Sequence, residues 1–532
     1  MNALDIIGQK LLLAFQGKEF TPEMQQALAS YKPGGVTFFR SFNISSPAQV
    51  KKLVSDLQEH AQNLGLSPLL IGADQEGGQL MAIGEGTTPL PGNMALGATG
   101  STDLARKTGE VLGRELAAMG INMNYAPCCD VNVNPRNPVI GTRSFGEDPK
   151  QVALMAAAMV EGIQSQGVAA VAKHFPGHGD TSTDSHLGLP SLPHSLDRLR
   201  SVEFLPFQSA IDADVKLTMS AHIAMPAIDG ADAPPATLSH AILTGLLREQ
   251  LGFEGVIVSD AMDMHAIQQG EKLGEECVKA STAGIDLLLV TADPADHKRA
   301  WNGLTRSYQY DLQFRVTCEH STERIEKLKS WLDEHKTTPG LEVVGSVEHL
   351  AVADEIADRS VTLVRDDAHL LPLSVDPVQR IVVIIPQPAD LTPADTSSYV
   401  VPELAASIRQ FHTNVDEIVI PFEPNGAVIQ KVLERSQGAA LVIIGTLNAF
   451  DCAAQADLVN KLLLTGIPTV VAALRMPYDL TAFDQAPAYL CTYSIQSPSM
   501  NALAKILFGK LKPQGRLPVS IPGLYPIGYR LD

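Results

Sequence analysis

The sequence lacks the features that mark a membrane or secreted protein. No stretch reaches about 18 consecutive apolar residues, the length that a membrane-spanning helix requires. The opening segment MNALDIIGQKLLLAF has no basic region ahead of an apolar one, and no lipid-anchor cysteine lies near the start. We therefore expect no contact with a membrane and a location in the cytoplasm.

The chain also has few cysteines and no cysteine pair with metal-binding spacing. Its six cysteines are scattered and form no C-x-x-C motif, namely Cys128, Cys129, Cys277, Cys318, Cys452 and Cys491. This pattern argues against a disulfide framework and against a structural zinc site. Thiols kept free in this way fit a reducing compartment, in agreement with the expected location.

Basic charge is scarce as well. The chain has 40 Lys and Arg against 59 Asp and Glu, which gives a formal net charge of −19. A surface this acidic repels nucleic acid and anionic lipid, so neither is expected as a partner. A small uncharged or carbohydrate ligand remains compatible with this charge, and the chain could act as a monomer or a homodimer.

What the sequence does contain is a regular alternation of short apolar runs with longer helical stretches. At 532 residues, the chain exceeds the usual size of a single domain. About eight apolar runs in the first part of the chain predict parallel strands buried on both faces: 11–15, 35–39, 68–74, 122–130, 168–174, 216–222, 255–260 and 285–291. Eight such units predict a (β/α)8 barrel of the TIM type, with an open doubly wound sheet as the alternative.

A polar segment rich in turn-forming residues, 336–340, marks the expected domain boundary. Residues 1–338 would form the barrel domain and residues 339–532 a smaller α/β sandwich domain. Five further apolar runs predict strands in this second domain: 361–364, 381–385, 441–444, 469–474 and 489–492. No repeat or low-complexity tract interrupts either part.

The densest group of ionisable residues is the segment KHFPGHGDTSTDSH, which covers residues 173–186. A predicted strand ends at Lys173 and His174, and the Pro and Gly residues that follow exclude a regular helix. Asp184 and His186 therefore lie on a loop, two residues apart, where extended side chains point the same way. A carboxylate beside an imidazole fixes its tautomer and raises its pKa, so His186 is a candidate proton donor and acceptor.

Two alternatives stay open for this loop. The first is structural, with His186 packed under the loop and Asp184 capping a turn. The second is a metal site, because the segment holds five potential ligands: His174, His178, Asp180, Asp184 and His186. His174 and His178 are four residues apart, but the Pro and Gly between them exclude the helix on which such a pair usually binds a metal, so we expect neither a metal nor another cofactor.

Three further segments place polar groups after predicted strands. GVIVSDAMDM puts Asp260 at a strand end, where a carboxylate could attack a sugar carbon as a nucleophile. Asp263 is a competing carboxylate, which we expect at the start of the next helix in a helix-dipole role. IGADQEGG offers Asp74 as an acceptor for sugar hydroxyls, and NPVIGTRSFGEDP offers Arg143, which could instead pair with Glu147 or Asp148.

Taken together, these segments resemble glycoside hydrolase family 3, specifically its bacterial β-N-acetylglucosaminidase branch. KHFPGHGDTSTDSHLGLP is the most specific match. DQEGG, IGTRSFGEDP, MSAHI and VSDAMDM follow the family's order, and the ending GRLPVSIPG is similar to the close of its second domain. The resemblance therefore covers the whole chain and implies a barrel followed by an α/β sandwich.

The resemblance also implies roles for individual residues. Asp260 would be the nucleophile, and His186, with Asp184 as its partner, the acid/base. The terminal sugar would be held by four residues: Asp74, Arg143, Lys173 and His174. The β-glucosidase branch places an acid/base glutamate in the second domain, whereas this chain has the D-x-H pattern of the hexosaminidase branch in the first.

The expected activity is retaining, exo-acting hydrolysis of terminal β-linked GlcNAc from peptidoglycan or chitin-type fragments. Alternatives are a β-glucosidase or β-xylosidase, a GlcNAc phosphorylase, and a non-catalytic sugar-binding relative. Gln79 and Ala82 depart from the family pattern, which usually has arginine at both positions. The sequence therefore does not determine which contacts replace these arginines in binding the sugar.

Overall fold

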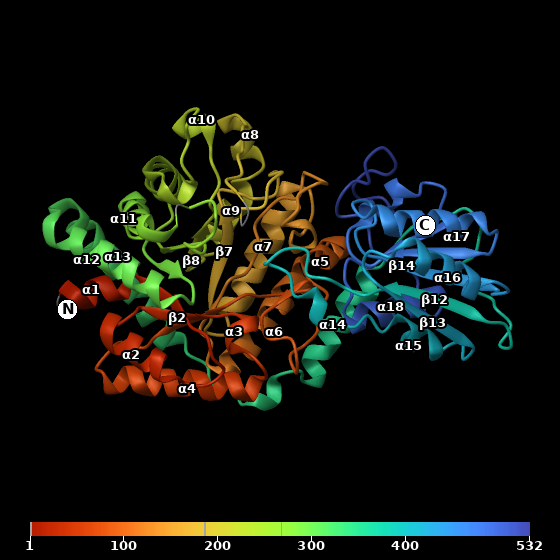
Figure 1. Ribbon diagram of the computed structural model, residues 1–532, viewed down its shortest axis with the longest axis horizontal. Coiled ribbons are helices and arrows are strands. Elements are labelled where there is room, and N and C mark those ends of the chain that lie inside the picture. The colour runs from red at the N-terminus through yellow and green to blue at the C-terminus, as the bar shows by residue number, and fades with distance from the viewer. Residues whose placement is uncertain (1–2, 186–187, 268) are drawn as a thin grey trace.

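The computed structural model describes residues 3–185, 188–267 and 269–532. Figure 1 shows two domains side by side along the long axis of the molecule, the N-terminal one in red to green and the C-terminal one in blue. Across the described residues, no helix combines the length and the apolar character that crossing a bilayer demands.

The N-terminal domain is built around an eight-stranded parallel sheet in the order β10-β1-β2-β3-β6-β7-β8-β9. Hydrogen bonds between β9 and the chain entering β10, with a bridge from Val258 to Leu287, close the sheet into a barrel. The strands are β1 (Leu11–Ala14), β2 (Gly35–Phe38), β3 (Leu70–Ala73), β6 (Met123–Asn124), β7 (Ala169–Phe175), β8 (Leu217–Ser220), β9 (Val256–Ser259) and β10 (Leu288–Val290).

Each of these strands overlaps one of the eight predicted runs, and only β7 extends beyond its run, by one residue. The barrel prediction is therefore confirmed, and the open-sheet alternative is wrong. Their residues are almost all buried, because barrel strands face side chains on the inside and helices on the outside. A short antiparallel hairpin, β4 (Gln75–Gly77) with β5 (Leu80–Met81), follows β3 directly and will matter for the site.

Helices surround the barrel. They are α1 (Ala3–Gln9), α2 (Pro22–Tyr31), α3 (Arg40–Asn43), α4 (Pro47–Asn63), α5 (Asn93–Thr99), α6 (Thr102–Met119), α7 (Pro149–Gln164), α8 (Leu196–Ser201), α9 (Leu205–Asp212), α10 (Pro226–Asp229), α11 (Leu273–Ala283), α12 (Pro294–Tyr310) and α13 (Leu312–His335). Short 3-10 helices are η1 (Gly141–Arg143), η2 (Ala236–Leu238) and η4 (Gly270–Lys272), and η3 (Ala241–Gln250) is a π-helix.

A repeated local signal starts several of these helices. A Ser, Thr or Asp side chain accepts a hydrogen bond from the first turn, and proline occupies the next position, as at Thr21, Ser46, Asp148 and Asp293. Proline fits there because its missing N–H would have no helical partner and its φ angle already suits a helix. The capping residue thus fixes where each helix begins relative to the preceding loop.

The C-terminal domain contains a six-stranded sheet in the order β11-β16-β15-β14-β12-β13, with β11 antiparallel to its neighbour and the other strands parallel. Its strands are β11 (Thr362–Asp366), β12 (Ile381–Pro386), β13 (Val415–Ile420), β14 (Leu441–Thr446), β15 (Thr469–Ala473) and β16 (Ala488–Cys491). Five of them were predicted. The edge strand β13 was missed, because Asp416 and Glu417 interrupt its apolar pattern.

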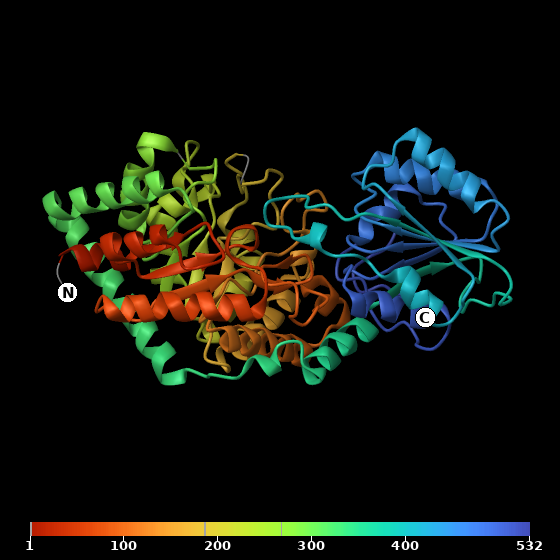
Figure 2. The ribbon, with the colours of Figure 1, turned by 60° about the horizontal axis from the view of Figure 1, so that its bottom comes forward.

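Helices cover both faces of this sheet, which gives the predicted α/β layered domain (Figure 2). They are α15 (Leu404–Arg409), α16 (Gly426–Ser436), α17 (Ala453–Leu464) and α18 (Ser497–Leu507), with the short turns η6 (Ser397–Tyr399) and η7 (Pro477–Ala482). The predicted boundary segment connects α13 to η5 (Leu341–Val343) and α14 (Val347–Ser360), and α14 packs against α5 and α6 of the barrel as well as α18.

One segment of the C-terminal domain reaches back to the barrel. It connects β12 with α15 and is seen in turquoise extending toward the barrel in Figure 2. Thr396 in this segment receives a hydrogen bond from the backbone of Met81 at 3.1 Å and donates one to the Gln79 carbonyl at 2.9 Å. The segment is thereby pinned to the β4–β5 hairpin.

Candidate active site

A cavity of about 700 Å³ lies where the carboxyl ends of the barrel strands meet. Strand ends β2, β3, β6, β7, β9 and β10 all contribute to its wall, as expected for the functional face of a parallel barrel. The segment from the C-terminal domain covers one side with Asp390, Thr392, Pro393, Ala394, Asp395, Thr396 and Tyr399. The cavity therefore belongs to both domains.

Most of the residues singled out from the sequence meet in this cavity. Its lining includes Asp74, Arg143, Lys173, His174 and Asp260. Asp184 is buried in the loop beside it, and the next residue, Ser185, lines the cavity. His186, the predicted acid/base, lies outside the described residues.

Four charged groups form one compact network on the cavity floor. Arg143 donates from Nη2 to Oε1 of Glu76 at 2.8 Å and from Nε to Oε2 at 3.1 Å. Lys173 bonds the same Glu76 carboxylate at 2.8 Å and also pairs with Asp74. Arg143 therefore does not pair with Glu147 or Asp148. Asp148 caps α7, and Glu147 accepts a hydrogen bond from Ser520.

The network favours the charged forms of Glu76 and Lys173. Burial alone would raise the pKa of Glu76, but the charges of Arg143 and Lys173 lower it to about 2. Burial would likewise lower the pKa of Lys173, yet the charges of Asp74 and Glu76 raise it above its usual value. Two anions and two cations balance one another, so the floor can present Asp74 and Lys173 to a ligand without a net charge.

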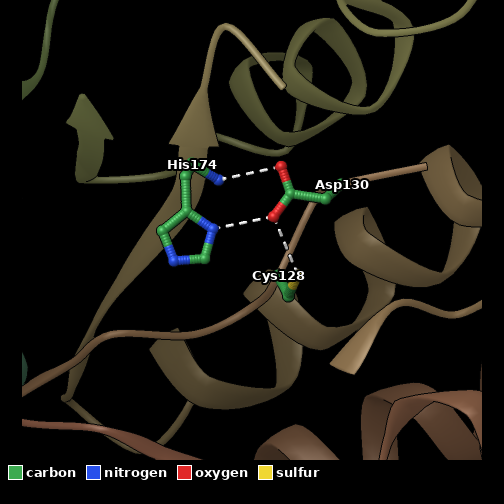
Figure 3. A group of neighbouring side chains, drawn as sticks. All are labelled: Cys128, Asp130 and His174. Carbon is green, nitrogen blue, oxygen red and sulfur yellow. Dashed lines mark hydrogen bonds and ion pairs between the residues drawn. The ribbon is translucent and has the colours of Figure 1, made fainter. Parts of the chain in front are cut away.

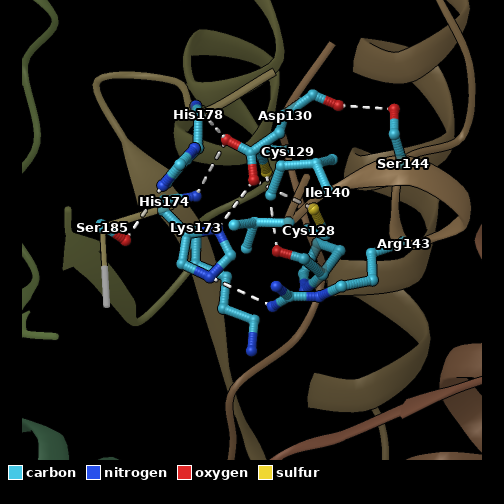
Figure 4. A network of polar contacts seen from close by, with 12 residues as sticks. Cys128, Cys129, Asp130, Ile140, Arg143, Ser144, Lys173, His174, His178 and Ser185 are labelled. Carbon is cyan, nitrogen blue, oxygen red and sulfur yellow. Dashed lines mark hydrogen bonds and ion pairs between the residues drawn. The ribbon is translucent and has the colours of Figure 1, made fainter. Parts of the chain in front are cut away.

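His174 is held in one orientation by its two partners (Figure 4). Its Nε2 lies 3.2 Å from Nη2 of Arg143, and a guanidinium can only donate. Nε2 must therefore accept, which leaves the proton on Nδ1, 2.7 Å from Oδ2 of Asp130. The ring is held in one tautomer and one orientation, with no freedom to act as a shuttle.

Asp130 organises this part of the wall. As Figures 3 and 4 show, its carboxylate accepts from Nδ1 and the backbone of His174, and it also accepts from the backbone of His178 at 2.6 Å. Burial raises the pKa of Asp130, but its interactions with His174 and His178 outweigh this and lower the pKa. An ionised Asp130 thus fixes both the end of β7 and the start of the following loop.

The group formed by Cys128, Asp130 and His174 has the residue types of a metal site (Figure 3). Its chemistry fits a hydrogen-bond network better. Burial raises the pKa of the Cys128 thiol well above its usual value, and the thiol donates to Oδ2 of Asp130 at 3.1 Å. His174 also faces the positive charge of Arg143, which would repel a cation.

The loop after β7 is anchored internally by His178. Its ring lies 2.7 Å from the Thr181 hydroxyl and 3.1 Å from the Ser185 hydroxyl. Burial lowers the pKa of His178 to about 4, so the ring is neutral near pH 7. Asp180, another residue of the metal alternative, instead bonds His194 at 2.7 Å. His178 and Asp180 thus form contacts that stabilise the conformation of the loop itself.

Asp260 follows β9 and is partly exposed to the cavity. The backbone N–H of Ala261 donates to its Oδ1 at 2.8 Å, and its own N–H bonds Ser220 of β8 at 2.9 Å. His222, beyond the end of β8, donates to the Ala261 carbonyl at 3.0 Å. The turn that carries the Asp260 carboxylate is therefore fastened to the neighbouring strand from two directions.

Asp263 does not occupy the start of a helix, so that prediction was wrong. The residues after β9 form turns, and α11 begins only at Leu273. Asp263 lines the same cavity as Asp260 and accepts a hydrogen bond from the Thr291 hydroxyl beyond β10. The turns arise because the chain must cross the cavity rim before it can pack against the barrel.

Gln79 and Ala82, the two departures from the family pattern, have different surroundings. Gln79 accepts from Thr142 at 2.6 Å and from Arg475 of the C-terminal domain at 2.9 Å. Ala82 is buried, lines the cavity and bonds the Asp74 carbonyl through its backbone at 2.9 Å. One position therefore serves domain contact, and the other leaves space in the cavity.

Sequence comparison identifies both domains. Residues 4–311 match the model described as "Glycosyl hydrolase family 3 N terminal domain", and residues 361–525 match "Glycosyl hydrolase family 3 C-terminal domain". The chain belongs to glycoside hydrolase family 3. The resemblance read from the motifs is thereby confirmed, as is the predicted architecture of a barrel followed by an α/β domain.

Several relatives of this family 3 hydrolase match it over nearly its whole length. A "Beta-hexosaminidase A" of Pseudoalteromonas piscicida is 32% identical, covering 98% of this chain and 97% of the relative. A "Beta-N-acetylglucosaminidase/beta-glucosidase" of Cellulomonas fimi is 30% identical, covering 86% and 84%. The solved structure of a family 3 β-N-acetylglucosaminidase from Paenibacillus sp. FPU-7 superposes with a TM-score of 0.92 at 34% identity, covering 98% and 99%.

Proposed function

We propose that this hydrolase is a retaining, exo-acting β-N-acetylglucosaminidase that cleaves terminal β-linked GlcNAc through a glycosyl-aspartate intermediate. The observation that carries the proposal is the gathering of Asp260, Asp74, Lys173 and Arg143 around one cavity. The near full-length likeness to β-N-acetylglucosaminidases supports GlcNAc as the sugar. Peptidoglycan or chitin fragments as its source and a cytoplasmic location stay predictions.

The charge balance of the cavity suits Asp260 as the nucleophile. Lys173 and Arg143 balance the charges of Asp74 and Glu76 on the cavity floor, and Asp260 lines the same cavity at the end of β9. A carboxylate placed there suits the anomeric carbon, where positive charge develops in the oxocarbenium-like transition state. Asp74 accepts hydrogen bonds from sugar hydroxyls, and Lys173 donates one.

The reaction we propose proceeds in two displacements. His186, protonated and steadied by Asp184, donates its proton to the leaving oxygen while Asp260 forms a bond to C1 and the glycosidic bond breaks. Water then loses a proton to neutral His186 and attacks C1, which releases Asp260 and the sugar. Both displacements invert C1, so the β configuration is retained overall.

Parallel assays of the p-nitrophenyl β-glycosides of GlcNAc, glucose and xylose test this proposal. We expect the GlcNAc substrate to have the highest kcat/KM, and proton NMR of the fresh product to show the β anomer first. Turnover of only the glucoside or xyloside would overturn the choice of sugar. Binding of GlcNAc without turnover would indicate a non-catalytic relative.

A phosphorylase is the further alternative, because a neutral imidazole base does not repel an incoming anion as a carboxylate would. Running the assay with and without inorganic phosphate separates the two reactions. Free GlcNAc in both conditions supports hydrolysis. A sugar 1-phosphate that accumulates only with phosphate would replace hydrolysis by phosphorolysis.

A further inference from the structure

Arg40 lines the cavity without taking part in the charge network described above. It is the first residue of α3, directly beyond β2. Phe38 at the end of β2 pairs with Ala73 at the end of β3, the residue before Asp74. The register therefore puts Arg40 and Asp74 side by side on the cavity rim.

The guanidinium of Arg40 is held in place from three sides. Its Nη1 donates to the Met81 carbonyl at 2.9 Å, and its Cζ lies 4.1 Å from the centre of the Tyr399 ring. A Cβ atom at Gly84 would lie 2.1 Å from Nη1, so only glycine leaves room for this arrangement. Tyr399 comes from the C-terminal domain, which therefore helps to position an arginine of the barrel.

Arg40 brings a half-buried positive charge to the cavity wall. Burial is the main cause that lowers its pKa, and the charges of Tyr399, Asp390 and Glu85 counteract this only in part. Among the contacts recorded for the described residues, no carboxylate forms an ion pair with Arg40, and its hydrogen bond uses only Nη1. A guanidinium has five N–H donors, so the bond to Met81 uses only part of its hydrogen-bonding capacity, and Arg40 lines the cavity where a ligand would lie.

The barrel topology indicates which part of a sugar this capacity would meet. Going round the closed sheet in either direction, β3 is four strands from β9, so Asp74 lies across the barrel mouth from Asp260. If Asp260 reaches C1, the opposite edge of the ring, with its 4- and 6-hydroxyls, faces β3 and the adjoining β2. Ala82, small and buried at the same place, leaves that space open.

We propose that Arg40 binds the 4- or 6-hydroxyl of the terminal sugar and that Tyr399 holds the guanidinium ready for this contact. The inference rests on the proposed function, whose C1 chemistry sets the orientation of the ring. It assigns the C-terminal domain a part in sugar recognition.

The test compares enzyme and substrate changes together. Wild type and Arg40→Ala are assayed on p-nitrophenyl β-GlcNAc and on its 4-deoxy and 6-deoxy analogues. A hydrogen bond to a charged group corresponds to about a 10- to 150-fold effect on kcat/KM. We expect wild type to lose this much on one analogue, and Arg40→Ala to lose a similar factor on the parent sugar but less than about threefold more on that analogue.

A purely structural role for Arg40 predicts a different pattern. If the variant lost as much as wild type on both deoxy analogues, the two changes would be independent and the proposal would be overturned. Unchanged activity of Arg40→Ala on the parent sugar would overturn it as well. Arg306→Ala, an exposed arginine on α12 outside the cavity, is the matched control and should behave as wild type on all three substrates.

Variants of Tyr399 test the second half of the proposal with little risk to folding, because 56% of this side chain is exposed. Tyr399→Ala should lower kcat/KM on the parent sugar and have no further effect when Arg40 is already alanine, while Tyr399→Phe should retain activity. An equal loss in both backgrounds would overturn the coupling. If wild type cleaved only the glucoside, the proposed function would fail, and the same comparison on deoxyglucosides would still test Arg40.

Discussion

Glu76 in the barrel and Asp479 in the C-terminal domain are both buried carboxylates near strand ends, yet their pKa values move in opposite directions. Burial raises both, but Arg143 and Lys173 bring the pKa of Glu76 down to about 2. Asp479 accepts from the Thr446 hydroxyl at 2.5 Å and the Phe450 backbone at 3.2 Å, and its pKa rises to about 7. Arg475 also acts to lower the pKa of Asp479, but burial outweighs it, whereas Glu76 forms direct ion pairs with two cations.

This difference separates a surface prepared for a ligand from a structural contact. In the barrel, Lys173 pairs with Asp74 at the wall of an open cavity, and its acidic neighbours raise its pKa. In the C-terminal domain, Asp479 satisfies a hydroxyl and a backbone N–H, which needs no charge. We therefore assign catalytic or binding roles to the barrel carboxylates and a structural role to Asp479. Each of the following variants tests one of these assignments.

The largest effect is expected from the nucleophile. Asp260→Asn should lower kcat/KM for p-nitrophenyl β-GlcNAc by about 10³- to 10⁵-fold, because an amide cannot form the covalent intermediate. Asp479→Asn is the matched control and should retain kcat within about twofold. A loss of kcat/KM below tenfold for Asp260→Asn, or a comparable loss in both variants, would contradict the different roles assigned to Asp260 and Asp479.

Glu76→Gln should have the next largest effect. Removing this charge leaves Arg143 buried without its carboxylate and Lys173 with only Asp74, which typically costs about 3–5 kcal/mol of unfolding free energy. Urea unfolding at pH 7, followed by circular dichroism, measures the change. A cost under about 1 kcal/mol would mean that the charge network does not stabilise the barrel.

Asp479→Asn should act in the opposite sense and depend on pH. The raised pKa means that the protonated carboxyl suits the fold, so stability from this group is fully present below its ordinary pKa of 3.8 and lost as pH rises through about 7. A shift of this size corresponds to at most about 4 kcal/mol. Above pH 7 the variant should therefore be more stable than wild type.

The comparison at low pH completes this test. Near pH 4 the advantage of Asp479→Asn should disappear, because wild type is protonated there, so the difference in unfolding free energy between the two proteins should narrow steadily from pH 8 to pH 4. A gain that stays constant with pH would show that packing, not ionisation, explains the variant.

The smallest effect is expected where the two domains touch. Gln79→Ala removes the acceptor shared by Thr142 and Arg475, but Arg475 keeps its ion pair with Asp395 at 2.7 Å. Two lost hydrogen bonds of this kind cost about 2 kcal/mol of unfolding free energy, and kcat/KM should change by less than about threefold. A larger loss of activity, with the thermal midpoint unchanged, would indicate that Gln79 contacts the substrate instead of the neighbouring domain.

Much of the fold could be predicted because buried parallel strands appear in the sequence as short, mainly apolar runs. All eight barrel strands were predicted from such runs, whereas β13 was missed. As an edge strand it pairs only with β12 and exposes one face, where Asp416 bonds Arg380 and Arg435. The pattern of an edge strand is mixed, and it requires a neighbour to be recognised.

The site was predicted in part for a similar reason. Polar residues at strand ends identified Asp74, His174 and Asp260, and the same signal was present at Asp130 but was not followed to a role. Glu76 was missed, although it lies in the DQEGG motif, because its importance comes from two cations more than 60 residues away in sequence. Long-range pairing of this kind leaves no local signal.

Arg40 and the covering segment around Tyr399 could not be predicted at all. They are more than 300 residues apart, and nothing in either stretch indicates that a guanidinium and a phenol ring meet over the cavity. Asp263 failed in the opposite way. Its sequence suggested a helix start, but the crossing of the cavity rim delays α11 to Leu273. Tertiary packing decided both outcomes.

The identity of the residue that attacks C1 tests the account most directly. A 5-fluoro glycosyl fluoride of GlcNAc should glycosylate the enzyme and hydrolyse slowly, since fluorine destabilises the positively charged transition state while fluoride leaves readily. Digestion and mass spectrometry of the trapped protein should find the sugar on Asp260. A label on Asp263, or no label on any carboxylate after inactivation, would contradict the mechanism.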